Sequence, residues 1–299
     1  MVNPFSSPQP LSTTRVPLPL GSPSRHLGGT LPTCLSLLCL GLTLAPLVAI
    51  LGYLGRLAWS GWDPAIFRLL PPAVGMSGGG IGNALLGTLI LVGLATGMSL
   101  PLGILTAVYL SEGDPQSLGV QSVRLAVQLL SGMPSIMAGL LGYGLFVLTT
   151  RQFSGVAGGF ALALIMLPLI IQTTTEALAS VPDELRWASL ASGASPMQTL
   201  WRVVMPVALP PLLTGITLAM TRAAGETAPL LLTALFSYFW PQGIGQPMPS
   251  LAVLIYNFAG IPFPRQQELA AIAALVLVGL ALLVNSMAQA IIWQGRSPR

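Results

Sequence analysis

Apolar residues fill long stretches of this 299-residue chain, and polar residues are confined to shorter segments between them. Each apolar stretch is close to or longer than the ~20 residues that a helix needs to cross the hydrocarbon core of a bilayer. The pattern therefore predicts an all-α, polytopic membrane protein with six transmembrane helices. We expect these helices at 33–55, 82–110, 123–149, 158–178, 208–235 and 268–293.

The composition supports this class and excludes several functions. Hydrophobic residues make up 53% of the chain and charged residues 7%, whereas soluble proteins have about 25% charged residues. All 12 basic residues are arginine, so the chain lacks the lysine of a Walker A motif and cannot itself be a P-loop ATPase. The one histidine, His26, precedes the first apolar stretch. We expect no catalytic residue, no metal site and no cofactor bound by this chain.

The chain divides into a transmembrane domain with two short tails. Residues 1–32 are rich in proline and serine and predict a flexible N-terminal tail. The transmembrane domain covers 33–293, and 294–299 form a C-terminal tail. The loops 56–81 and 236–267 are aromatic, which is typical of an interfacial belt or, alternatively, of a docking surface for an external protein.

The distribution of arginine predicts the orientation of the chain in a bacterial plasma membrane. With six spans both termini lie on one side, and an excess of basic residues marks the cytoplasmic side. If both termini are cytoplasmic, that side carries Arg15, Arg25, Arg124, Arg186, Arg202, Arg296 and Arg299, and the outer side carries Arg56, Arg68, Arg151 and Arg265. The arginines are scattered along the chain, which argues against nucleic acid as a partner.

A polar loop at 179–207 separates the fourth and fifth spans. Ser180, followed by a proline and two acids, is typical of a helix start. Gly193 is typical of a helix end, because glycine adopts the left-handed conformation readily. Ser195 and Gln198 then form the pattern of a capping box, with a proline between them at the first helical position. The loop is predicted to hold two short helices around a glycine hinge.

The second of these helices carries an apolar stripe. Met197, Leu200, Trp201 and Val204 recur at helical spacing, so they are expected to share one face. An apolar face on a water-exposed loop requires a surface against which it can dock.

Two opposite charges lie inside the predicted fifth span. Arg222 is about 21 Å along the helix from the start of that span, which is too far for its side chain to reach the inner interface. We expect it to be buried, at a cost of at least ~2.5–3.5 kcal/mol, and to pair with Glu226 one turn later. The pair could be a structural salt bridge, or it could relay an anion, because a guanidinium binds two oxygens of a tetrahedral oxyanion at once.

The residues that follow Arg222 favour an opening in the helix. Thr227 offers a hydroxyl donor beside the charged pair. Pro229 has no amide hydrogen, which leaves the carbonyl of Gly225 without its helical partner. We interpret this segment as a candidate gate on a substrate pathway.

The 179–207 loop resembles the Glu-Ala-Ala loop of permease subunits of bacterial ABC importers. The residues in the register of that motif are Ala188, Gly193, Val203, Met205 and Pro206. Trp187 stands where the motif has glutamate and Ser189 where it has its second alanine. The loop therefore departs from the motif at the position of its ionic residue.

The stretch from Arg222 to Leu230 is similar to the RAxGETAPL sequence of phosphate importer permeases of the PstA type. The resemblance implies a type I permease fold with a cytoplasmic coupling loop. It also implies a second homologous permease, an ATPase dimer that binds ATP and Mg, and an external phosphate-binding protein. The residues expected to couple to the ATPase are Ala188, Gly193, Met197, Leu200, Trp201, Val203 and Pro206.

Three other functions are compatible with parts of the pattern. A permease for sulfate or molybdate would keep the same coupling loop, although the Gly225 to Pro229 sequence favours phosphate. A secondary transporter or channel could use Arg222 and Glu226 as an ion site without any ATPase. A structural or sensor membrane protein would show no flux.

Overall fold

The computed structural model describes residues 30–295, and all secondary structure within that range is helical. The chain divides into two compact units, Met1–Ile50 and Leu51–Arg299. Most of the predicted N-terminal tail, up to residue 29, and residues 296–299 lie outside the described residues. The helix α1, Thr30–Trp59, crosses the boundary between the units. Its side chains from 32 to 50 are exposed and mostly apolar, as a helix in a lipid environment requires.

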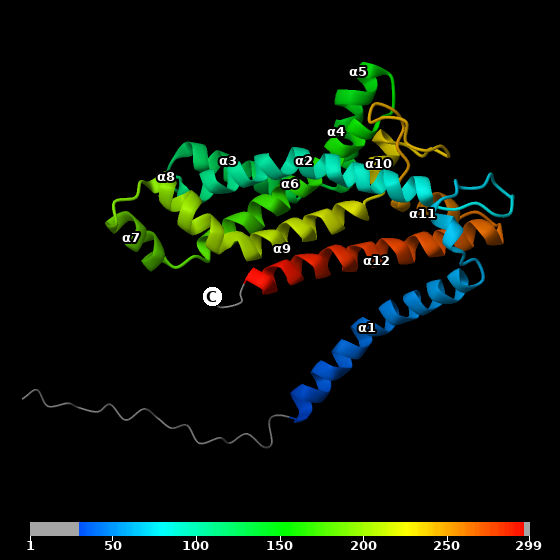
Figure 1. The fold of residues 1–299 in the computed structure, drawn as a ribbon, viewed down its shortest axis with the longest axis horizontal. Coiled ribbons are helices and arrows are strands. Elements are labelled where there is room, and N and C mark those ends of the chain that lie inside the picture. Colours follow the sequence, from blue (N-terminus) through cyan, green and yellow to red (C-terminus); the bar gives the residue numbers. More distant parts are fainter. Residues whose placement is uncertain (1–29, 296–299) are drawn as a thin grey trace, which may run out of the picture. The chain divides into compact units, whose positions relative to one another are not determined.

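Four long helices form the body of the second unit (Figure 1). They are α2 (Gly82–Glu112), α6 (Gly155–Ala179), α9 (Met205–Ala224) and α12 (Pro264–Gly295). The helix α6 is the most buried of the candidate spans, with 61% of its most apolar window inside the unit. It contacts both α2 and α9, and α12 packs on α9. The helix α6 is therefore the centre around which the other spans are arranged.

The predicted third span, 123–149, is sharply bent and is not one continuous helix. It consists of α3 (Leu118–Ser131) and α4 (Ser135–Gly142), which continues through a π-helical turn, Tyr143–Val147, into α5 (Leu148–Thr150). The two parts meet at 104°. A glycine and a proline occupy the break, and both disfavour a continuous helix. The described residues therefore hold five helices long enough to span a membrane, or six if the bent pair counts as one span.

The predicted fifth span, 208–235, is also interrupted. The helix α9 ends at Ala224, and the short helix α10 (Ala228–Thr233) follows it. The helix α4 packs closely on α10, because a Cβ atom at Gly139 would lie 2.7 Å from the Cα atom of Pro229. Glycine at position 139 therefore permits this close approach of the two short helices.

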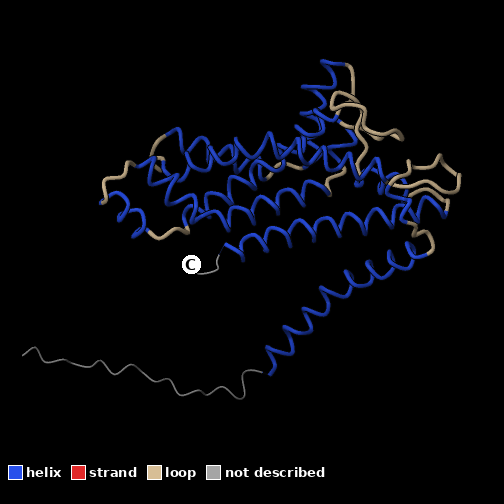
Figure 2. Tube along the Cα trace, in the orientation of Figure 1, coloured by secondary structure: helices blue, strands red, loops and turns tan. Residues whose placement is uncertain are grey.

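The predicted loop 236–267 contains a helix that the sequence pattern did not reveal. The helix α11, Leu251–Ala259, begins at Ser250, whose hydroxyl accepts a hydrogen bond from the amide of Val253. Nine residues are too few to cross a bilayer, and α11 packs on α12 instead. Figure 2 shows that the connecting loops gather at the ends of the helices in this unit.

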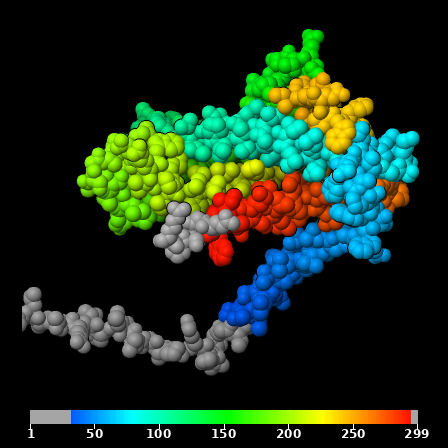
Figure 3. Space-filling model, viewed as in Figure 1, coloured from blue at the N-terminus to red at the C-terminus, as the bar shows by residue number. Residues whose placement is uncertain are grey.

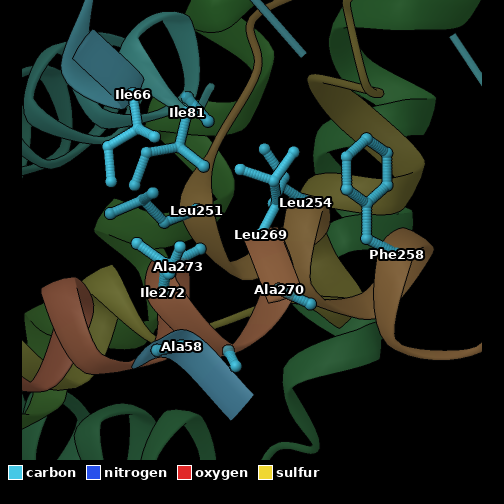
Figure 4. Close-up of a cluster of buried hydrophobic side chains, with 12 residues drawn as sticks. Ala58, Ile66, Ile81, Leu251, Leu254, Phe258, Leu269, Ala270, Ile272 and Ala273 are labelled. Atoms are coloured by element: carbon cyan, nitrogen blue, oxygen red, sulfur yellow. The ribbon is translucent and has the colours of Figure 1, made fainter. Parts of the chain in front are cut away.

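An apolar cluster fixes the end of the second unit that carries these loops (Figure 4). Its fully buried members come from α11, from α12 and from the segment before α2, and include Leu251, Leu254, Phe258, Leu269, Ile66 and Ile81. A short 3₁₀ helix, Pro64–Phe67, brings Ile66 into the cluster. The guanidinium of Arg265 also donates hydrogen bonds to the carbonyls of Gly78 and Gly79. The loop before α2 is therefore anchored to α12.

Candidate functional site

The polar loop folds as the two predicted short helices. The helix α7 covers Asp183–Ala191 and α8 covers Pro196–Thr199. Between them, Gly193 has φ +86°, in the left-handed region that glycine favours. The capping box at Ser195 is also present, because the amide of Gln198 donates to the hydroxyl of Ser195 and the amide of Ser195 donates to the side-chain carbonyl of Gln198. The glycine hinge and the second helix start are confirmed.

The predicted cap at the start of the first loop helix is wrong. The N-cap residue of α7 is Pro182, which provides no side-chain hydrogen bond. Ser180 instead ends α6, where its hydroxyl donates to the carbonyl of Ala177. The two acids Asp183 and Glu184 occupy the first turn of α7 as expected, and they interact favourably with the positive end of the helix dipole.

Side chains from α7 connect the loop to the rest of the unit. Arg186 forms an ion pair with Glu112, at the end of α2, with 2.7 Å between Nη1 and Oε1. The same guanidinium donates to the carbonyl of Leu178 at the end of α6. Ser189, which replaces an alanine of the motif, has its hydroxyl 2.9 Å from that of Thr199 on α8. A hydrogen bond therefore joins the two helices of the loop, and Arg186 attaches the loop to α2 and α6.

The predicted apolar stripe is divided between the interior and the surface. Leu200 and Val204 are buried in a cluster with the end of α6, so they do not belong to an exposed docking face. Met197 and Trp201 are exposed, and the indole N–H of Trp201 donates to the sulfur of Met197 over 3.0 Å. The spacing of apolar residues shows that they share a face, but it does not show which of them another helix of the same chain covers. Here the end of α6 covers Leu200 and Val204.

The exposed apolar side chains of the loop belong to both of its helices. Trp187 is exposed on α7, and Met197 and Trp201 are exposed on and just after α8. The loop lies beyond one end of α2 and α6 (Figure 1) and forms one end of the face shown in the space-filling view (Figure 3). We name Trp187, Met197 and Trp201 the loop face.

The other predicted coupling residues have different environments. Ala188 is exposed on α7, and Gly193 and Pro206 are also exposed. Val203 is partly buried. It lies in a π-helical turn, Leu200–Val204, that joins α8 to α9. Pro196–Ala224 is therefore one helical run of 29 residues, which carries the chain from the loop to Arg222.

The charged pair lies at the far end of this run. Arg222 is in the last turn of α9, and Nε lies 4.0 Å from Oε1 of Glu226. The Arg222 side chain is 61% exposed on this chain and that of Glu226 is 18% exposed. The expectation of a buried Arg222 is therefore wrong for the isolated subunit. Glu226 lies beyond the end of α9, so the pair does not have the geometry of two side chains on a continuous helix.

The predicted opening of the helix is confirmed. Gly225 ends α9, and Thr227 precedes α10 and is partly buried. Pro229 lies in the first turn of α10, where its missing amide hydrogen costs no helical bond. The chain therefore changes direction beside Arg222 and Glu226, as a gate would require.

A cavity next to Arg222 is lined by polar residues that were not among the predicted site residues. It has a volume of about 180 Å³ and is lined by residues of α3, α4, α6 and α9, which include Ser131, Ser135, Gln172 and Arg222. The side-chain amide of Gln172 donates to the hydroxyl of Ser131 over 2.8 Å. Gln172 is a polar side chain within an apolar span, and that feature alone could have identified it.

The sequence matches a known family over most of its length. Residues 37–292 match the family described as binding-protein-dependent transport system inner membrane component. The chain is 38% identical over 231 residues to the phosphate transport system permease protein PstA of Yersinia pestis, which is 77% of this chain and 78% of that protein. It is also 38% identical over 221 residues to PstA 1 of Mycobacterium tuberculosis (strain CDC 1551), at 72% of each chain.

Solved structures share the fold. A chain of the MetNI methionine ABC transporter, in an inward-facing conformation, aligns with a TM-score of 0.58 and 21% identity over 72% of this chain and 93% of that chain. A chain of a bacterial alginate ABC transporter, in complex with a periplasmic protein that binds an alginate pentasaccharide, aligns with a TM-score of 0.56 and 15% identity over 86% and 91%. These likenesses concern the architecture alone.

Proposed function

Because the chain belongs to the family of binding-protein-dependent transport system inner membrane components, and within it to the PstA phosphate permeases, we infer that it is the membrane-spanning subunit of an ATP-driven importer of inorganic phosphate. It is a multi-pass membrane protein. The observation that carries the mechanism is the helical run Pro196–Ala224, since it connects an exposed loop to the charged pair at Arg222.

The loop 179–207 is proposed to dock on a separate ATPase subunit. The loop face (Trp187, Met197 and Trp201) supplies two tryptophans and a methionine, and these residue types are enriched at protein interfaces. The chain has no lysine with which to form a Walker A motif, so ATP and Mg are assigned to that partner. From membership of the family we also propose that the complex contains a second homologous permease and an external phosphate-binding protein.

Coupling is proposed to work through the helical run as a lever. Closure of the two ATPase subunits on ATP would displace α7 and α8 together, because Ser189 and Thr199 join them. About 40 Å of helix lies between Pro196 and Arg222, so the displacement reaches the break at Gly225–Thr227. Opening of the pathway would then alternate between the two sides of the membrane.

Arg222 is proposed to guide the anion at the break. Its exposure on this chain places the guanidinium where a second permease subunit, or a pathway between the subunits, can reach it. Glu226 weakens the attraction between Arg222 and an anion, which favours release over tight retention. Both termini, with the loop, are assigned to the cytoplasmic side.

The assignment is tested by reconstituting the complete complex and measuring ATP hydrolysis. Phosphate delivered by its binding protein should stimulate hydrolysis, and sulfate should not. Equal stimulation by both anions would favour a permease for a broader class of oxyanions. Hydrolysis that responds to neither anion would contradict the proposed function.

A further inference from the structure

The cavity beside Arg222 lies where the two interrupted spans meet α6. Ser131 is the last residue of α3 and Ser135 is the first of α4, so the bend places one serine on each side of it. Gln172 comes from α6, and Arg222 comes from the end of α9. The volume of about 180 Å³ is more than ten times the ~15 Å³ that one water requires. The cavity therefore has room for a tetrahedral anion that retains part of its hydration shell.

The polar groups of this cavity are only partly used within the chain. The hydroxyl of Ser131 accepts from Gln172, which leaves its own hydrogen available to donate. In the part of the chain that the structure describes, neither the Ser135 hydroxyl nor the side-chain carbonyl of Gln172 has a hydrogen-bond partner. Arg222 has only the long contact with Glu226. The cavity thus offers donors from Arg222 and the serines and an acceptor from Gln172.

This combination fits phosphate better than sulfate. At neutral pH inorganic phosphate keeps at least one proton, so one of its oxygens is a hydrogen-bond donor, whereas every oxygen of sulfate is an acceptor. A site made only of donors would accommodate either anion. The side chain of Gln172 is exposed on this chain, so its carbonyl accepts from water until the anion enters. In the occupied site, a ligand that cannot donate to this carbonyl leaves a polar group unpaired, which favours the protonated anion.

We propose that Gln172, together with Ser131 and Ser135, completes a transit site for phosphate around Arg222, and that the side-chain carbonyl of Gln172 accepts the phosphate proton. This inference rests on the proposed function and assigns new residues to it. Arg222 supplies the charge, the serines donate to unprotonated oxygens, and Gln172 selects for the protonated form. The amide of Gln172 keeps its bond to Ser131 while the carbonyl of Gln172 accepts from the anion.

The test uses the complete complex in vesicles and compares phosphate uptake per assembled complex. Gln172→Leu removes both polar atoms at similar volume, and uptake should fall at least about tenfold, equivalent to the loss of one or more hydrogen bonds to a charged ligand. Gln172→Glu keeps the shape but adds a negative charge, and it should lower uptake further. The matched control is Gln289→Leu, on the exposed surface of α12. Uptake by Gln172→Leu equal to that of the control would overturn the proposal.

Ser131→Ala separates direct contact from a structural role. It removes the partner of Gln172 and leaves the amide itself, so it should reduce uptake less than Gln172→Leu does. Because Ser131 is itself a proposed donor, discrimination between phosphate and sulfate is compared as well. It should survive in Ser131→Ala and be lost in Gln172→Leu, and its loss in both variants would mean that Gln172 only holds the bend against α6 and would overturn the assignment of direct contact.

A binding measurement keeps the proposal testable if a variant fails to transport. Broadening of the ³¹P signal of inorganic phosphate by the assembled complex should be reversed by arsenate, which is protonated, and not by sulfate. The Gln172→Leu complex should lose this discrimination, and its retention would contradict the role of the carbonyl. A wild-type complex that takes up no phosphate would refute the proposed function itself, whereas normal uptake by both proteins would refute only this inference.

Discussion

The guanidinium of Arg186 and the carboxylate of Glu112 are 2.7 Å apart and connect the first helix of the polar loop to the end of α2. The loop is therefore attached to α2 by this ion pair and is continuous with α9. Trp187 stands where the resembled motif has its ionic residue, and the residue just before it, Arg186, forms this ion pair.

Breaking this ion pair should impair coupling more than folding. Arg186→Glu places two acids together, and a partly exposed pair is worth about 1 kcal/mol or less to stability, so the protein should still assemble. Phosphate uptake should fall because α7 no longer moves with α2. The exchanged pair, Arg186→Glu with Glu112→Arg, should recover most of the uptake. If the exchange restores nothing while assembly is normal, the pair does not transmit motion.

Substitutions at Gly193 test the hinge through its backbone conformation alone, because a new side chain there would meet no neighbouring atom. No atom would lie within 4 Å of a Cβ at this position, so only the backbone conformation, φ +86°, resists substitution. Gly193→Val should cost about 1–2 kcal/mol of local strain and reduce coupled uptake, whereas Gly193→Asn should be tolerated because asparagine adopts this conformation more readily. Equal uptake by the two variants would show that the hinge has no role in coupling.

The loop face (Trp187, Met197 and Trp201) should become protected when the ATPase binds. After Cys34 and Cys39, which are both exposed, are replaced by serine, single cysteines at Met197 and Trp201 should react with a thiol reagent in the isolated permease pair. They should react slowly in the complex. A cysteine at Leu200 should react slowly in both, because Leu200 is 5% exposed. The exposed control is Met76, in the loop before α2.

Helix-capping patterns predicted most of the polar loop correctly, and the wrong assignments concern Ser180 and Leu200. The capping box at Ser195 and the left-handed Gly193 depend on a few neighbouring residues, so the sequence was sufficient for both. Ser180 was misassigned because the same serine fits the end of one helix and the start of the next. Leu200 was placed on the docking face because the pattern gives a stripe and not the neighbour that covers part of it.

In the transmembrane helices, too, the sequence pattern gave the positions of the elements but not their tertiary contacts. Length and hydropathy located the spans but gave no value for the 104° bend between α3 and α4, whereas Pro229 did predict the opening between α9 and α10. Arg222 was expected to be buried because it lies far from the predicted end of its span. Its position along the helix does not show whether another helix of the same chain covers its side chain, which is 61% exposed. Gln172 is visible as a polar residue in an apolar span, but its pairing with Ser131, 41 residues away, could not be read from the sequence.

The charged pair can be assigned a role by comparing single and double substitutions. Arg222→Gln should abolish uptake in an assembled complex, and Arg222→Lys should restore little of it, because an ammonium group cannot bind two oxygens as a guanidinium does. Replacing both Arg222 and Glu226 by methionine removes the charges together, so the complex should assemble and still not transport. Robust uptake by the double variant would show that the pair is only structural.

Phosphate import by this permease should require ATP hydrolysis. Vesicles that contain the complete complex, with phosphate-binding protein outside, should accumulate radiolabelled phosphate when ATP is enclosed. They should not do so with a non-hydrolysable analogue, and excess sulfate should leave the rate unchanged. Phosphate accumulation that proceeds without ATP hydrolysis, driven by an ion gradient alone, would contradict the assignment of this chain to an ATP-driven importer.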